Sequence, residues 1–215
     1  MSGAPPRLPA DAQARLQQLM APSPGRSPRR LLGLVGAPGA GKSTVAEAIA
    51  AALGEQARVV PMDGYHLAQA ELERLGRAGR KGAPDTFDSD GYVALLRRLR
   101  TQTGDERVYA PEFRREIEEP VAGAIGVHGD TPLIVTEGNY LLLEQGPWQQ
   151  VAGLLDEVWY VDVDETARRE RLKARHMRYG RSEQQALDWM AQTDDPNARL
   201  IAAGRARAHW ILSWD

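Results

Sequence analysis

The chain has 215 residues, of which 42% are hydrophobic, so it can bury one substantial core. Its formal net charge of −2 gives no overall attraction to nucleic acid or to an anionic membrane. Cysteine is absent, which excludes disulfides and thiolate chemistry, and no apolar run approaches the length of a membrane span, so we expect a cytoplasmic protein that contacts neither membranes nor nucleic acid.

The first 29 residues predict an N-terminal helix and a linker, followed by one main domain over residues 30–215. A short helix is expected over residues 9–21, after a Pro/Gly/Ser-rich start that we expect to be poorly ordered. The first half of the main domain predicts strands over residues 31–35, 58–63 and 108–109, and helices over residues 44–53 and 92–100. Residues 76–90 are expected to form a loop that is functional or disordered, and residues 111–120 an irregular charged segment.

The second half of the main domain continues the alternation of strands and helices. It predicts strands over residues 131–137 and 157–163 and a closing edge strand over residues 209–213. A strongly basic helix is expected over residues 165–178, and two further helices over residues 182–191 and 197–206. Strands that alternate with helices imply an α/β protein whose parallel sheet is covered on both faces.

Residues 36–43, Gly-Ala-Pro-Gly-Ala-Gly-Lys-Ser, match the phosphate-binding loop G-x-x-x-x-G-K-[ST], the P-loop, at every fixed position. A chance match in a chain of this length has a probability of roughly 1%, and the loop lies between a predicted strand and a predicted helix. In this motif the backbone N–H groups cradle the phosphates of a nucleoside triphosphate, the lysine reaches the β- and γ-phosphates, and the serine holds Mg²⁺. The nucleotide-binding residues are therefore predicted to be Gly36, Ala37, Gly39, Ala40, Gly41, Lys42, Ser43 and Thr44.

Two carboxylates terminate predicted strands, where reactive groups collect in a parallel sheet. Phosphoryl transfer needs a carboxylate that accepts the proton of the substrate hydroxyl, and we assign this role to Asp63. Glu137 is the candidate for a metal site, with Mg²⁺ held directly or through water. The alternative for both is an acid that caps the turn at the following glycine.

The basic helix and its exit carry many arginines, and we expect a lid around residues 168–182 that supplies positive charge to the transferring phosphoryl group. The alternative is a solvated charged surface paired with Glu165 and Glu170. The arginines are Arg168, Arg169, Arg171, Arg175, Arg178 and Arg181.

Loops that mix polar, aromatic and cationic groups are typical of an acceptor pocket. A lone histidine such as His66 is more often a turn or core residue, and the tryptophans at 148, 159 and 189 are more often packing residues. With Asn139, which belongs to a motif given below, the predicted substrate-binding residues are Tyr65, His66, Thr86, Phe87, Asp88, Phe113, Arg114 and Asn139.

Several motifs occur in an order that resembles the uridine kinase, pantothenate kinase and phosphoribulokinase group of P-loop kinases. Besides the P-loop they are Pro-Met-Asp-Gly-Tyr-His at 61–66, Lys-Gly-Ala-Pro-Asp-Thr-Phe-Asp at 81–88, Glu-Gly-Asn-Tyr-Leu-Leu-Leu at 137–143 with Pro-Trp at 147–148, and Asp-Pro-Asn at 195–197. The likeness covers about residues 30–213 and is strongest to bacterial proteins labelled fructose transport system kinases or nucleoside/nucleotide kinase family proteins.

This resemblance implies a P-loop NTPase fold, a three-layer α/β/α sandwich with a parallel sheet, and ATP with Mg²⁺ as cofactors. It implies Asp63 as the catalytic aspartate, Glu137 as the metal-associated glutamate and Arg175 and Arg178 as lid arginines. Lys42 completes the predicted catalytic set.

This sequence departs from the group's pattern at positions that bear on the phosphoryl acceptor. Uridine kinases usually carry a ribose-binding aspartate near the position of Gly82, close relatives have an aspartate where Arg114 stands, and their Ala-Asp near the C-terminus is Ala208-His209 here. A sugar, polyol or pantothenate-like alcohol is therefore the expected small-molecule substrate. The basic residues of these loops suit an acid or a phosphorylated substrate: Arg74, Arg77, Arg80, Lys81, Arg114 and Arg115.

Three alternatives remain beside this reading. One is a nucleoside kinase of the uridine type, and another is a nucleotide-dependent switch or regulatory ATPase. The third is a relative that binds ATP without catalysis, against which the intact Lys42, Ser43, Asp63 and Glu137 argue. The expected assembly is a monomer or a homodimer.

Overall fold

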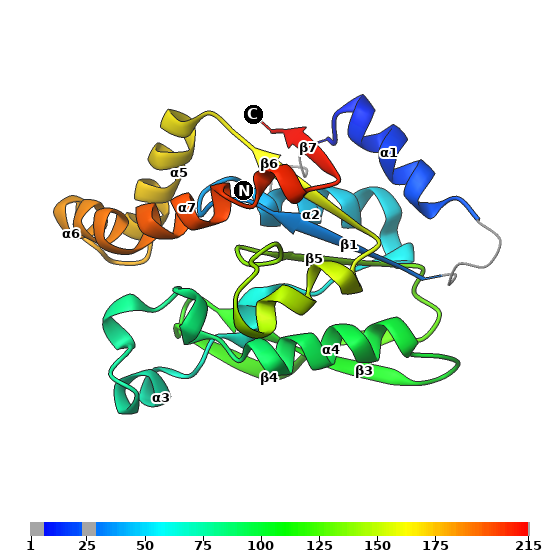
Figure 1. Cartoon of the computed structure of the whole chain (residues 1–215), viewed down its shortest axis with the longest axis horizontal. Coiled ribbons are helices and arrows are strands. Elements are labelled where there is room, and N and C mark those ends of the chain that lie inside the picture. Colours follow the sequence, from blue (N-terminus) through cyan, green and yellow to red (C-terminus); the bar gives the residue numbers. More distant parts are fainter. Residues whose placement is uncertain (1–6, 23–28, 215) are drawn as a thin grey trace.

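A computed structural model describes residues 7–22 and 29–214, so most of the start expected to be poorly ordered, residues 1–8, and most of the expected linker lie outside the described residues, whereas Leu8 is buried. Five parallel strands form the central sheet (Figure 1), and their buried apolar runs explain why they lie inside the molecule. In spatial order they are β2 (Ala57–Val59), β5 (Leu133–Gly138), β1 (Arg30–Val35), β6 (Glu157–Asp162) and β7 (Trp210–Ser213).

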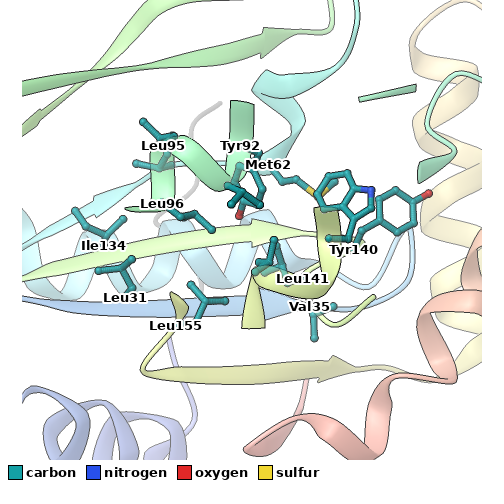
Figure 2. Packing of buried hydrophobic residues seen from close by; sticks show 14 of the residues in the cluster. Leu31, Val35, Met62, Tyr92, Leu95, Leu96, Ile134, Tyr140, Leu141 and Leu155 are labelled. Carbon is teal, nitrogen blue, oxygen red and sulfur yellow. The ribbon is translucent and has the colours of Figure 1, made fainter. Parts of the chain in front are cut away.

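Helices and turns cover both faces of this sheet, because side chains along β1 alternate between two apolar clusters. Leu32 and Leu34 pack on α1 (Ala10–Met20) and α2 (Lys42–Leu53). Leu31 and Val35 pack on the opposite face, with residues of α4 (Ser89–Thr101) and of the 3-10 turns Gly146–Gln150 and Ala152–Leu154 (Figure 2). The expected three-layer α/β/α sandwich is confirmed.

A separate antiparallel hairpin, β3 (Arg107–Arg114) and β4 (Glu119–His128), packs beyond α4. The expected irregular segment at 111–120 is therefore wrong, because the chain continues as a strand on both sides of a tight turn. The pairing shifts register between Ala110 and Glu112, and this bulge accommodates Pro111 within a strand.

The second strand is shorter than expected. It ends at Val59, and Asp63 lies on the following 3-10 turn, Met62–Tyr65, rather than at the end of a strand. The expected loop at 76–90 consists of short turns, Ala78–Arg80 and Pro84–Thr86, after α3 (Gln69–Arg74).

Three helices gather near the carboxyl ends of β1 and β6, to the left of the sheet in Figure 1. They are α5 (Glu165–Arg178), which has the predicted bounds, α6 (Glu183–Trp189) and α7 (Asp195–Ala202), with a π-helical turn at Met190–Asp194 before α7. Ser182 and Gln185 form a capping box at the start of α6. Among the helices of the described ranges, none combines the length and hydrophobicity that crossing a bilayer requires.

Candidate active site

The P-loop connects β1 to α2. Strand β1 has β5 on one side and β6 on the other, so the loop lies at the switch point from which the chain adds strands in both directions along the sheet. Gly39 and Gly41 have φ values of 86° and 88°, a backbone conformation that residues with a Cβ rarely adopt. The loop therefore needs glycine at both positions to aim its N–H groups inward. The lysine that follows is the first residue of α2.

Three oxygen atoms hold the ammonium group of Lys42. Its Nζ donates to the carbonyl oxygens of Gly36 at 2.9 Å and Ala37 at 3.3 Å, and to Asn139 Oδ1 at 2.8 Å. Burial lowers the pKa of Lys42 to about 8, although Glu137 and Asp63 act in the opposite direction. A phosphate chain next to Nζ would favour the protonated form.

Glu137 stands near the carboxyl end of β5, opposite Leu34 of β1. Its Oε1 accepts a hydrogen bond of 2.9 Å from Ser43 Oγ, so one serine and one carboxylate meet at the edge of the P-loop. Burial and the charge of Asp63 raise the pKa of Glu137, while Lys42 and Ser43 oppose this rise. Hydroxyl and carboxylate oxygens are the donors that Mg²⁺ takes beside nucleotide phosphates, so this pair fits the predicted metal site.

Asp63 faces the same region from the Met62–Tyr65 turn, and Arg115 Nη2 donates to its Oδ2 at 3.1 Å. Burial acts to raise the pKa of Asp63, but the surrounding His66, Arg115, Lys42 and Arg175 outweigh it and hold the pKa below its usual value. Asp63 is therefore a carboxylate at neutral pH. An ionised carboxylate is the form that can accept a hydroxyl proton.

His66 closes the Asp63 turn, and its Nδ1 lies 2.7 Å from the carbonyl oxygen of Asp63. Its ring packs between Phe87 and Phe113, with centroid distances of 4.0 and 4.5 Å. Burial lowers the pKa of His66 despite the nearby carboxylate. His66 thus supplies an aromatic surface to the cavity and also serves as a turn residue.

A cavity of about 430 Å³ joins these groups. The predicted residues that line it are Lys42, Ser43, Asp63, His66, Phe87, Phe113, Glu137, Asn139 and Arg175. Arg175 is the one arginine of α5 among the lining residues; its pKa is lowered by burial and by the charge of Arg115.

Other predicted residues do not line the cavity. Arg178 is exposed at the end of α5, and Arg114 pairs with Glu112 on the hairpin surface. Asp88 caps α4 by accepting from the Gly91 N–H. Tyr65 and Thr86 also do not line it: the Tyr65 ring meets Tyr92, and the Thr86 hydroxyl bonds to the backbone of the 82–86 turn.

The basic residues of the predicted acceptor loops also divide into two groups. Arg74, Arg77 and Arg80 form ion pairs with Glu71 or Asp85, and none of the three lines the cavity. Lys81 and Arg115 do line it, and both approach the ring of Phe113, at 5.5 and 5.8 Å from the centroid.

The structure adds to the cavity lining an expected lid arginine and two residues with no expected site role, His176 and Asp194. Arg181 stacks on Trp189 at 4.0 Å, so this tryptophan is a cavity residue rather than a purely packing one. Arg181 Nη1 also lies 2.9 Å from His176 Nδ1, and His176 Nε2 lies 2.7 Å from Asp194 Oδ2. Only the arginine cluster and the Asp-Pro-Asn motif pointed toward this wall, because its geometry depends on the π-helical turn before α7.

Comparison with known proteins places this geometry in a family. The chain is 34% identical over 184 residues to a Schizosaccharomyces pombe protein named "Putative uridine kinase", a match that covers 80% of this chain and 78% of that protein. The chain belongs to the uridine kinase-like family of P-loop kinases. A search of protein-family models gave no match.

Two solved structures agree with this assignment. A protein from Silicibacter sp. TM1040 described as a "putative fructose transport system kinase" is 37% identical, with a TM-score of 0.83 over 96% of this chain and 98% of that one. A Saccharomyces cerevisiae protein described as a "putative P-loop containing kinase with a circular permutation" is 19% identical and shares the fold, with a TM-score of 0.79 over 95% of this chain and 98% of that one. As a member of this family, the uridine kinase-like chain is a nucleotide-binding kinase.

Proposed function

We propose that this kinase transfers the γ-phosphoryl group of ATP to an alcohol of a small metabolite, such as a sugar, a polyol or a pantothenate-like compound. One observation carries the proposal: the Asp63 carboxylate lines the same cavity as Lys42 and Ser43. The phosphate grip and a base for the incoming hydroxyl therefore face one another across a single space.

In the proposed reaction the acceptor oxygen forms a bond to the γ-phosphorus while the bond to the β,γ-bridging oxygen breaks. ADP leaves, and the hydroxyl proton passes to Asp63. Lys42 and Arg175 would stabilise the negative charge of the transferring group, since both line the cavity with Asp63 and act on its charge. Ser43 and Glu137 would hold Mg²⁺, which neutralises phosphate charge.

A nucleoside acceptor is the second candidate, and the name of the Schizosaccharomyces pombe relative favours it. The aromatic rings of Phe113 and His66 offer a surface on which a base can stack. Gly82 argues against it, because it stands near the position where uridine kinases usually carry a ribose-binding aspartate. A regulatory ATPase would use the same nucleotide grip but would need no acceptor.

ADP release coupled to NADH oxidation tests these candidates. We expect at least one compound from a panel of sugars, polyols, pantothenate and uridine to raise ADP release well above the rate without acceptor. Asp63→Asn is expected to lower kcat by about 10²- to 10⁴-fold. Asp105→Asn, at an exposed turn far from the cavity lining, is the matched control and is expected to keep full activity. If every acceptor leaves the slow basal rate unchanged, the regulatory ATPase replaces the proposal.

A further inference from the structure

An ion pair with Arg115 engages the Asp63 carboxylate, which is the proton acceptor in the proposed reaction. Arg115 follows the last residue of β3, and its Nη2 donates to Asp63 Oδ2 at 3.1 Å. A carboxylate that accepts from a guanidinium is less basic and presents fewer free oxygen lone pairs. For Asp63 to receive a hydroxyl proton efficiently, Arg115 has to exchange this partner for another.

The backbone positions Arg115 for such an exchange. A Cβ at Gly64 would lie 2.3 Å from the carbonyl oxygen of Pro111, so the Asp63 turn and the bulge of β3 touch backbone to backbone. This contact fixes the base of the hairpin near Asp63. The side chain of Arg115 is 36% exposed, so it has access to the cavity from the hairpin turn.

Of the described residues, five cationic side chains and four acids line the cavity. Among the cations, Lys81 and Arg115 both approach the ring of Phe113, and Arg181 lies over Trp189. The acids are Asp63, Glu118, Glu137 and Asp194, of which Asp194 is already bonded to His176 and Glu137 to Ser43. Once Asp63 is engaged with a hydroxyl, a new anion in the cavity would give Arg115 another partner.

We propose that the acceptor alcohol carries a carboxylate or phosphate group, which takes Arg115 from Asp63 and thereby frees the Asp63 carboxylate for the hydroxyl proton. This inference rests on the proposed kinase function and specifies its substrate class. The planar guanidinium matches either anion with two parallel hydrogen bonds, so the exchange replaces one anionic partner with another. A neutral acceptor would have to separate the pair without offering Arg115 a new anion.

In the completed step the acceptor oxygen bonds to the γ-phosphorus, the bridging oxygen leaves with ADP, and Asp63 keeps the proton. Arg115 stays on the substrate anion throughout, so it is a binding residue for the acceptor and a positioning residue for Asp63. Lys81 adds a second positive charge beside the same ring. Its Nζ also donates to the Glu118 carbonyl, which ties the 76–90 segment to the hairpin turn.

Matched pairs of alcohols that differ in charge test the proposal. The probes are D-glycerate with glycerol, pantothenate with panthenol, and fructose 6-phosphate with fructose, each measured by coupled ADP release and by thermal shift with Mg²⁺ and a non-hydrolysable ATP analogue. We expect the charged member of at least one pair to exceed its neutral partner by tenfold or more in kcat/KM. Pairs with a carboxylate and pairs with a phosphate separate the two sources of anion.

Variants of Arg115 then connect this preference to the ion pair. Arg115→Gln is expected to raise KM for the charged acceptor by about tenfold or more, while kcat with neutral acceptors stays equal or rises. Arg115→Lys should restore part of the preference, and the thermal midpoint of each variant reports its folding. Arg107→Gln, an exposed arginine at the far end of β3, is the control and should keep the preference.

Three results would overturn the inference, and they differ from a failure of the kinase function. Equal or better turnover of the neutral member in every pair would reject an anionic acceptor and leave the kinase intact. A rise in KM for ATP alone in Arg115→Gln would assign Arg115 to the nucleotide. If no probe shifts the thermal unfolding midpoint, the anion site is rejected. If charged probes shift this midpoint but are not phosphorylated, the kinase proposal is rejected and the anion site is kept.

Discussion

Ser43 Oγ donates a hydrogen bond of 2.9 Å to Glu137 Oε1, and this bond joins the first turn of α2 to the carboxyl end of β5. It brings a residue of the P-loop motif together with a carboxylate 94 positions later in the chain. The two side chains present oxygen atoms at the edge of the cavity where the β- and γ-phosphates would lie.

If this pair holds Mg²⁺, then Glu137→Gln should raise the MgCl₂ concentration needed for half-maximal ADP release by about 10- to 100-fold. The amide keeps the shape of the side chain but loses the charge that a divalent cation requires. Glu144→Gln is the control, because Glu144 is exposed and pairs with Arg207. An unchanged Mg²⁺ requirement in Glu137→Gln would remove Glu137 from the metal site.

Nucleotide binding should take up a proton near pH 8, because burial lowers the pKa of Lys42 to about 8 and phosphate oxygens favour its charged form. Below this pH Lys42 is already protonated, so uptake is small at pH 6.5. It should reach about half a proton at pH 8, and ATP affinity should fall as the pH rises further. Calorimetry in buffers of different ionisation enthalpy measures the uptake.

Lys42→Met provides the matched comparison for this titration. It removes the ammonium group and should abolish the proton uptake assigned to Lys42 together with most of the affinity for the phosphates. The same uptake in wild type and Lys42→Met would mean that another group titrates.

Gly64→Ala should disturb the hairpin, because the added Cβ would lie 2.3 Å from the Pro111 carbonyl oxygen and 2.7 Å from its carbon. Both atoms belong to the backbone, so relief requires the hairpin to move. We expect about 1–3 kcal/mol of lost stability in urea denaturation and a higher KM for the acceptor. Gly153→Ala is the control, since a Cβ there meets nothing within 4 Å. Equal effects of both changes would contradict a specific contact.

Arg175 and Arg178 lie within one turn of α5, yet only Arg175 lines the cavity. Arg175→Ala should therefore lower kcat by about 10²- to 10³-fold, as expected for loss of a group that stabilises transition-state charge. Arg178→Ala should change kcat less than about threefold by comparison, because its side chain is exposed. Steady-state ADP release at saturating ATP separates the two. A large loss in Arg178→Ala would mean that the end of α5 reaches the phosphates during turnover.

Features that depend on local sequence were predicted well. The P-loop, the strand before it and the helix after it follow from a motif with fixed spacing. The bounds of α5 were also predicted correctly from its basic, helically spaced residues, and the structure adds the cap that Asp164 provides. Glu137 was placed on a strand by the apolar run before it. These elements needed no information about distant segments.

Features that depend on long-range pairing were missed. Strand β4 contains Pro120, Gly123 and Gly126, which weaken the strand signal, and it forms only because β3 lies opposite. The same pairing decides that Arg115 rather than Arg114 reaches Asp63, since neighbouring side chains on a hairpin point in different directions. Spacing alone predicted a basic loop without indicating which residue faces the site.

The β3–β4 hairpin forms a small sheet of its own, apart from the five strands that carry the P-loop. Phe113 near the end of β3 and Arg115 in the turn line the cavity, while Val108, Ala110, Ile125 and Val127 pack in the core with α4 and Pro111 touches Gly64. Substitutions confined to the tip of this hairpin would therefore alter which molecules the cavity accepts, whereas the triphosphate loop, carried by a different sheet, would keep its shape.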